Sequence, residues 1–298
     1  MTSDASILVV GKNGQLARCL AAQAGRRGTP LQAIGRPQID LVRPESIHAV
    51  LSAVRPRAIV NAAAYTAVDR AETDSANAFA INATGAGCLA DAAARFGIPL
   101  IHVSTDYVFD GRKGAPYVEE DRASPLGVYG ASKFAGETAV RRAHPAATIL
   151  RSSWLYSVWP PNFVTTMLRL VSERPVLRVV DDQRGNPTSA LDLAGAILDL
   201  IDRSECRGAV YHLSGRGETT WYGFAEAIFE GWSQRGRRAP RLERISTQNY
   251  GATAPRPADS RLDCSKAERE LGIRLPDWRS SLEACLDELT RADAKERS

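Results

Sequence analysis

Three residues that together can deliver a proton to a carbonyl lie within residues 105–133 of the chain. Thr105 ends an apolar run, and Tyr129 and Lys133 follow it four residues apart. That spacing places Tyr129 and Lys133 on one face of a helix. A nearby ammonium lowers a phenol pKa from about 10, and a hydroxyl can orient a carbonyl oxygen toward the phenol. The set therefore predicts a proton donor for a carbonyl that accepts hydride from a nicotinamide.

The alternative for Tyr129 and Lys133 alone is an amphipathic helix with a buried tyrosine and a solvated lysine. The position of the pair weighs against it, because the pair follows a glycine-rich turn and a predicted strand that ends in Ser104-Thr105, and all three would converge at the carboxyl ends of the strands. The composition adds a further point. Of 38 lysines and arginines only five are lysines, which leaves 33 arginines. A compact ammonium one helical turn from a tyrosine is therefore a rare feature of this chain, and arginine does not substitute for it freely.

A glycine-rich turn near the start of the chain predicts a dinucleotide site. Gly11, Gly14 and Ala17 give the spacing G-x-x-G-x-x-A between an apolar run and a helical stretch. Such glycines permit a tight turn and close approach of a pyrophosphate to the N-terminus of a helix. The alternative is an ordinary strand–turn–helix corner. The residues expected to bind cofactor here are Gly11, Asn13, Gly14, Gln15 and Leu16.

Residues after the next two predicted strands extend this site. Arg36 stands where NAD-binding proteins often have an acid, so it favours the 2′-phosphate of NADPH, with NADH as the alternative. Asp40 and Leu41 are expected to flank the adenine. Ala63 and Ala64 are small enough for a flat cofactor to cross the strand ends.

Apolar runs alternate with helical patterns through the first 150 residues. The runs lack polar alternation, which is typical of a parallel sheet covered on both faces, and the order predicts a doubly wound α/β fold of Rossmann type. The expected strands are 7–10, 31–34, 58–61, 100–103 and 148–150, and the expected helices are 15–26, 44–54, 74–96 and 129–142.

The pattern loosens after residue 150, where most tryptophans and proline-rich turns lie. We expect a dinucleotide-binding domain over 1–150 and a smaller α+β substrate domain over 151–175 and 215–298. Residues 176–214 are expected to return in part to the first domain, with strand-like runs at 177–180 and 209–213 as candidates for its sheet.

Composition excludes several classes of protein. A hydrophobic content of 44% and a charged content of 24% are ordinary for a globular chain, and a net charge of +4 without a basic stripe argues against nucleic-acid binding. The five cysteines form no C-x-x-C pair and the four histidines have no ligand spacing, so we expect no metal. There is no apolar run of membrane-spanning length and no secretory signal pattern, so we expect a cytoplasmic protein without membrane contact.

Longer segments carry a resemblance to a known family. The chain resembles the extended short-chain dehydrogenase/reductases and, among them, the dTDP-4-dehydrorhamnose reductases. The most discriminating segments are Ala64-Tyr65-Thr66-Ala67-Val68-Asp69, Asp182-Gln183-Arg184-Gly185-Asn186-Pro187-Thr188 and Arg256-Pro257-Ala258-Asp259-Ser260-Arg261-Leu262, and further matches are Gly11 to Leu16, Ser104 to Phe109, Tyr129 to Lys133 and Arg151 to Tyr156.

This resemblance implies reduction of the C4 ketone of dTDP-4-dehydro-L-rhamnose by NAD(P)H. It assigns proton donation to Tyr129, binding of the nicotinamide ribose to Lys133 and completion of the catalytic set to Thr105. The residues it places on the sugar nucleotide are Asp106 and Trp154, and those it places along the cofactor are Ala64, Tyr65 and Thr66. From their proline-rich setting, Arg256 and Arg261 are expected to bind the diphosphate.

Two departures and two alternatives stay open. Ala17 replaces a frequent glycine, and where some members bridge a dimer by magnesium on glutamates this chain has Cys19 and a position near Leu191. We therefore expect a monomer or homodimer without bridging magnesium. The alternative functions are another nucleotide-sugar epimerase, dehydratase or reductase of the superfamily, and a non-catalytic regulatory subunit resembling the methionine adenosyltransferase β subunit.

Overall fold

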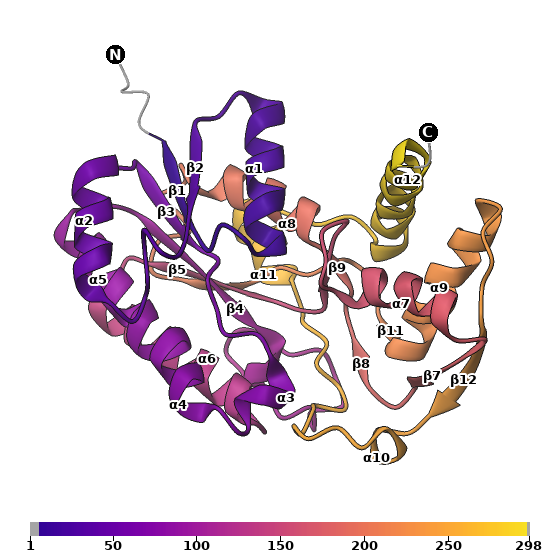
Figure 1. The fold of residues 1–298 in the computed structure, drawn as a ribbon. Helices are drawn as coiled ribbons and strands as arrows, with labels where there is room; N and C mark the ends of the chain where they lie inside the picture. The colour runs from indigo at the N-terminus through magenta and orange to yellow at the C-terminus, as the bar shows by residue number, and fades with distance from the viewer. Residues whose placement is uncertain (1–5, 297–298) are drawn as a thin grey trace.

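The computed structural model describes residues 6–296, and its centre is a six-stranded parallel sheet in the order β10-β5-β4-β3-β1-β2 (Figure 1). The strands are β1 (Ile7–Val10), β2 (Leu31–Ile34), β3 (Ala58–Asn61), β4 (Leu100–Thr105), β5 (Thr148–Ser152) and β10 (Val210–His212). The first half of the chain supplies the helices α1 (Gln15–Arg27), α2 (Pro44–Val54), α3 (Val68–Ala71), α4 (Ser75–Phe79), α5 (Ala86–Arg95) and α6 (Val128–Ala143), with a π-helical turn η1 (Ala80–Gly85) and a 3-10 turn η2 (Asp106–Val108). The predicted doubly wound α/β fold is confirmed.

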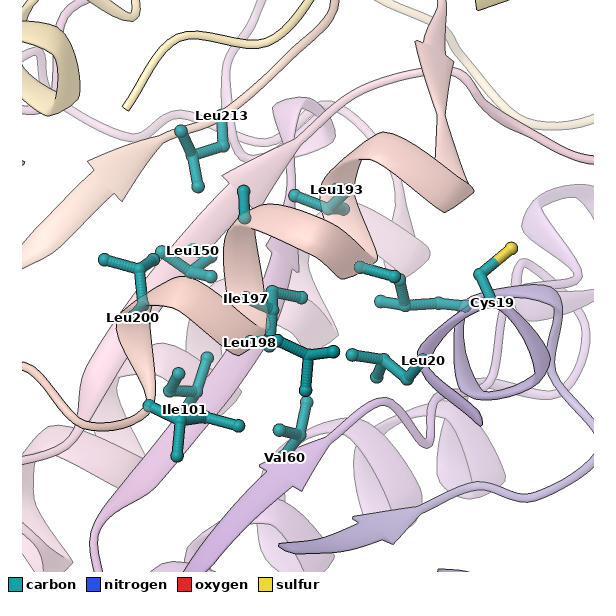
Figure 2. Packing of buried hydrophobic residues seen from close by; sticks show 14 of the residues in the cluster. Cys19, Leu20, Val60, Ile101, Leu150, Leu193, Ile197, Leu198, Leu200 and Leu213 are labelled. Carbon is teal, nitrogen blue, oxygen red and sulfur yellow. The ribbon is translucent and has the colours of Figure 1, made fainter. Parts of the chain in front are cut away.

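Each face of the sheet is covered by its own set of helices. Alternate side chains of β1 separate the two: Ile7 and Val9 pack toward α1, α8 (Ala190–Leu200) and α11 (Ser265–Leu271), whereas Leu8 and Val10 pack toward α2, α5 and α6. Figure 2 shows the first core, where leucines and isoleucines of α8 meet the strands and α1. Burial on both faces explains why the strands lack polar alternation.

The predicted long helix over 74–96 is interrupted. Its middle is the π-helical turn η1, between α4 and α5. A Cβ on Gly136 of α6 would lie 2.1 Å from the carbonyl oxygen of Asn82, so α6 and η1 approach at backbone contact. The π turn directs Asn82 toward α6, where its amide donates to Ser132 Oγ at 2.9 Å. Wider turns of this kind are frequent at functional sites.

The remaining elements form a body at the carboxyl ends of the sheet strands (Figure 1). Its strands are β6 (Leu155–Tyr156), β7 (Val176–Val180), β8 (Arg184–Gly185), β9 (Thr188–Ser189), β11 (Thr219–Thr220) and β12 (Arg241–Ile245). Its helices are α7 (Phe163–Glu173), α9 (Trp221–Gln234), α10 (Thr247–Tyr250) and α12 (Trp278–Glu296). A separate core that includes Phe224 and fully buried Trp278 holds α7, β7, α9 and α12 together.

One expectation for the main sheet is correct and one is wrong. The run at 209–213 joins the sheet as β10, parallel to β5. The run at 177–180 also forms a strand, β7, but it pairs in parallel with β12 and stays outside the main sheet. An apolar strand is stable when its side chains are buried, and those of β7 are buried in the core with α7 and α9. The division into two domains stays a prediction.

Candidate active site

The glycine turn after β1 has the geometry that phosphate binding requires. Gly11 has φ +112°, and a Cβ there would lie 2.9 Å from the backbone nitrogen of Ala63, so a side chain is excluded. Gly14 caps α1 without a side-chain hydrogen bond, and the first turn of the helix holds no acidic residue. The N–H groups at this helix start are therefore available to an anion.

One cavity of about 480 Å³ extends from this turn over the ends of β1, β2 and β3. It brings together most residues expected to bind the adenosine half of the cofactor: Gly11, Asn13, Gly14, Arg36, Asp40, Leu41, Ala63, Ala64 and Tyr65. Arg36 is exposed, and Lys12 and Arg70 line the same cavity. Three cations at this edge suit an additional phosphate group.

Hydrogen bonds fix the chain after β3 against η1 and the start of α4. The amide of Asn82 donates to the Tyr65 carbonyl at 3.0 Å, and its oxygen accepts from the Tyr65 N–H at 2.7 Å. The Tyr65 hydroxyl donates to Asp74 at 2.9 Å. The small side chains of Ala63 and Ala64 thus face the cavity on a fixed backbone.

A second cavity, also of about 480 Å³, adjoins the first and shares with it Asn13, Gly14 and Ala62 to Ala64. It brings together Gln15, Leu16, Thr66, Thr105, Asp106, Tyr129, Lys133 and Trp154. The Gln15 side chain is engaged in hydrogen bonds within the protein: its amide donates to the Leu155 carbonyl at 3.1 Å, and its oxygen accepts from Ser157 at 3.1 Å. The small residues and free helix N-terminus of the two cavities fit an extended dinucleotide.

Thr105, Asp106 and Tyr129 meet at the carboxyl end of β4. The Thr105 hydroxyl donates to Asp106 Oδ1 at 3.0 Å and also hydrogen-bonds Tyr129. The Asp106 carboxyl is buried, its Oδ2 lacks a hydrogen-bond partner within the described residues, and burial raises its pKa to about 7. Burial also raises the pKa of Tyr129 to about 12, against the lowering effect of the Thr105 hydrogen bond. Tyr129 is therefore a protonated phenol at neutral pH.

Lys133 lies behind Tyr129 on α6 and is almost fully buried. Its ammonium donates to the Val103 carbonyl at 2.7 Å, and burial lowers its pKa to about 8. That Lys133 lowers the pKa of Tyr129 stays a prediction. The ammonium is directed at β4, and desolvation dominates the titration of the phenol.

Aromatic residues form the wall opposite the catalytic set. The indole rings of Trp154 and Trp221 stack with centroids 3.5 Å apart and an interplanar angle of 5°. Trp154 has φ +46°, and a Cβ on Gly185 would lie 2.4 Å from its ring, so β8 supports the stack from behind. Beyond Trp221 a further cavity of about 550 Å³ runs along α7 and β7.

The two arginines expected at the diphosphate already have acidic partners. Arg256 pairs with both carboxylate oxygens of Asp69, at 2.8 and 3.1 Å, and lines the cavity along β7. Arg261 pairs with Asp259 at 2.6 Å and with Glu218 at 2.5 Å. Because two carboxylates surround Arg261, the geometry favours a structural role for it.

Cys19, where some family members have a magnesium-binding glutamate, lies on α1. Cys19 is buried, and burial raises its pKa to about 12, so its thiol is a poor metal ligand. Among residues 6–296 no group of three histidine, cysteine or acidic residues is arranged to hold a metal ion. Within the same range no helix is both long and apolar enough to cross a membrane.

Several residues of the site carry no sequence signal that singles them out. Asn82 acts from within an alanine-rich helix, and Ser152 and Ser153 reach the cavity because β5 ends beside β4. Trp221 becomes a wall residue only through its stack on Trp154. From the sequence, Trp221 could either stack on thymine or a sugar or belong to the core of the second half of the chain.

Comparisons with known proteins agree with this geometry. The family described as "RmlD substrate binding domain" matches residues 5–291. A dTDP-4-dehydrorhamnose reductase of Sinorhizobium fredii is 47% identical over 92% of this chain and 94% of its own length, and one of Burkholderia thailandensis is 40% identical over 95% and 98%. The crystal structure of the Bacillus anthracis dTDP-4-dehydrorhamnose reductase in complex with NADP superposes with a TM-score of 0.89 at 35% identity, over 95% of this chain and 99% of that one.

Proposed function

The chain belongs to the RmlD substrate binding domain family, and we propose that it is an NADPH-dependent oxidoreductase that reduces the C4 ketone of dTDP-4-dehydro-L-rhamnose to give dTDP-L-rhamnose. One observation carries the proposal. Thr105, Tyr129 and Lys133 line a cavity that shares the end of β3 and the glycine turn with the adenosine-side cavity. A ketone and a nicotinamide thus have adjoining places in one cleft.

The cofactor, which supplies hydride when bound, is held by the chain in three parts. Gly11 and Gly14 leave room for the pyrophosphate at the N-terminus of α1. Arg36 at the exposed edge attracts the 2′-phosphate that distinguishes NADPH from NADH. Lys133 lines the other end of the cleft, where its ammonium would bind the ribose next to the nicotinamide.

The catalytic set orients the ketone and supplies the proton. When the Thr105 hydroxyl turns its single proton from Asp106 to the C4 oxygen, it orients the ketone, and Tyr129 transfers its phenolic proton to that oxygen as negative charge develops there. A phenol that is protonated at neutral pH is the correct form for this step. Lys133 stabilises the phenolate that remains, by electrostatic attraction.

The sugar nucleotide approaches from the aromatic side of the cleft. Asp106 offers a buried oxygen without a partner in the described residues, which suits a sugar hydroxyl. The Trp154 and Trp221 rings suit the apolar face of a deoxysugar, and the cavity along β7 leads onward past Arg256. Binding of the diphosphate by Arg256 would require that its pairing with Asp69 loosens.

The test is a product assay with the purified chain. We expect NADPH oxidation only when dTDP-4-dehydro-L-rhamnose is added, with dTDP-L-rhamnose as product and a higher kcat/KM with NADPH than with NADH. Cofactor binding without turnover would favour the regulatory alternative. Conversion of the sugar without net NADPH oxidation would favour an epimerase or dehydratase. Cytoplasmic location and a monomer or homodimer without bridging magnesium stay predictions.

A further inference from the structure

The face of α6 that carries Tyr129 and Lys133 continues one turn further to Glu137. The spacing of four is repeated, so the three side chains lie in one row along the helix. Glu137 is 3% exposed, and none of the chemistry described above uses it. A buried carboxylate is costly unless it is paired, so its partners indicate what it is for.

Three hydrogen bonds hold the Glu137 carboxylate in place. Arg151 on β5 donates from Nε to Oε1 at 3.0 Å and from Nη2 to Oε2 at 2.7 Å, and Ser104 Oγ donates to Oε1 at 2.5 Å. Ser104 immediately precedes Thr105 on β4. The carboxylate therefore ties α6 to the ends of the two strands that border the catalytic cavity.

Arg151 is itself held on its other sides. Its guanidinium lies 5.2 Å from the centroid of the Phe109 ring, and Nη1 donates to His212 Nε2 at 3.4 Å. The His212 Nδ1 hydrogen-bonds the Tyr117 carbonyl at 3.0 Å and burial lowers the pKa of His212 to about 3, so this imidazole is neutral. The neutral ring accepts from Arg151 and adds no charge to the cluster.

We propose that Glu137 is a positioning residue for the reaction, which supplies a fixed buried negative charge one turn behind Lys133 and so keeps Lys133 an ammonium beside Tyr129. The proposal rests on the proposed function for its catalytic meaning. The effect of the Glu137 carboxylate on the protonation of Lys133 involves only residues of this chain. A buried ion pair such as Glu137 with Arg151 contributes little net stability, which makes a purely structural purpose a weak explanation for it.

The charges around Lys133 support this role. Burial lowers the pKa of Lys133 and the Glu137 carboxylate raises it, with the balance at about 8. His102 on β4 is neutral because burial and Lys133 both lower its pKa. Other ionisable groups that line the same cavity as Lys133 are Tyr129 on the same helix and Asp106 and Tyr107 after β4, and Arg151 on β5 pairs with Glu137. The negative charge that opposes the effect of burial on the pKa of Lys133 comes from Glu137.

The experiment is an NMR titration of the lysine side chains in the full chain without substrate. The chain has only five lysines, so Lys133 can be assigned by comparison with a Lys133→Met variant. We expect E137Q to lower the pKa of Lys133 by about one unit or more, as loss of a nearby opposite charge does. The matched control E173Q removes an exposed glutamate that pairs with Arg169 and leaves the Lys133 titration unchanged.

A second variant separates charge from folding. If E137Q does not fold because Arg151 is left unpaired, the double variant E137Q/R151M removes both charges, and the Lys133 pKa still falls, by less. An unchanged Lys133 titration in whichever variant folds would overturn the proposal. In the reductase assay, the pH at which kcat/KM declines on the alkaline side falls with the Lys133 pKa; a uniform loss of kcat at every pH would indicate a structural role instead.

Discussion

The two halves of the cleft bind through different physical means. The adenosine half is made of glycine and alanine backbone, and its charged residues, such as Arg36 and Arg70, stand at the exposed rim. The catalytic half contains buried ionisable groups, among them Asp106 and Lys133, whose pKa values are displaced to about 7 and about 8. The first half depends on shape and helix polarity, and the second depends on desolvated charge.

This difference teaches where the chain tolerates change. A backbone site fails when a side chain intrudes on it, and a buried electrostatic site fails when a single atom or charge is removed. Substitutions in the two halves should therefore separate cofactor affinity from turnover and from pH dependence.

The largest effect is expected at the proton donor. Tyr129→Phe removes the phenolic proton and keeps the ring, which lies 5.7 Å from that of Tyr107. We expect kcat with the keto sugar to fall about 10²- to 10⁴-fold, the usual contribution of a general acid. NADPH affinity, measured by fluorescence titration, should stay near that of the unmodified chain. A variant that keeps full turnover would contradict the assignment.

The adenosine half should respond most to a methyl group on its turn. Gly11→Ala places a Cβ 2.9 Å from the Ala63 nitrogen at a φ of +112°, and strain of about 1–3 kcal/mol corresponds to about 5- to 150-fold weaker NADPH binding. Gly28→Ala is the matched control, since Gly28 also has positive φ but no atom within 4 Å of the added Cβ. The control should lose some stability and keep its NADPH affinity. Equal loss of affinity in both variants would show that strain alone is responsible.

The buried Asp106 carboxyl should make the stability of the catalytic half depend on pH. Its pKa in the fold is about 7, above the ordinary 3.8, so the fold favours the protonated form and loses stability as pH rises between these values. Between pH 5 and pH 8 the unmodified chain should lose about 2–3 kcal/mol more unfolding free energy than Asp106→Asn. Urea denaturation at the two pH values measures this difference, and parallel changes in both proteins would refute it.

The smallest effect is expected at the aromatic wall. Trp221→Leu removes the ring stacked on Trp154, and a stack of this kind contributes about 0.5–1.5 kcal/mol. The KM for the sugar nucleotide should rise up to about 10-fold, while the dissociation constant of NADPH stays unchanged. If only the dissociation constant of NADPH rises, Trp221 contacts the cofactor and not the sugar nucleotide.

Sequence reasoning was most accurate where structure is local. The runs at 7–10, 31–34 and 58–61 are strands with the predicted bounds, and α2 covers the predicted 44–54. The strands β1 and β3 are short, apolar and bounded by turns, and their pattern reflects burial on both sheet faces. The π turn at η1 was missed. It packs at backbone contact against α6 where Asn82 meets Gly136, 54 positions further along the chain, so no local pattern marks it.

The second half of the chain shows the limit. Two-residue strands such as β6, β8 and β9 are too short to show a periodic pattern. The strand β7 pairs with β12 and does not join the main sheet. For Arg256 and Arg261 the sequence could not tell a ligand from an ion-pair partner. That choice depends on where Asp69, Glu218 and Asp259 lie after folding.

The sequence by itself determined the parallel sheet, the glycine turn and the grouping of Thr105, Tyr129 and Lys133, because each depends on residue types and spacing along one or two elements. Only the tertiary structure decided how those groups titrate. Burial makes Tyr129 a weaker acid and lowers the pKa of Lys133 to about 8. Glu137, which opposes this lowering, meets Arg151 only when α6 packs across β4 and β5. Desolvation depends on what packs around a side chain in the folded protein, so it cannot be predicted from the local sequence pattern.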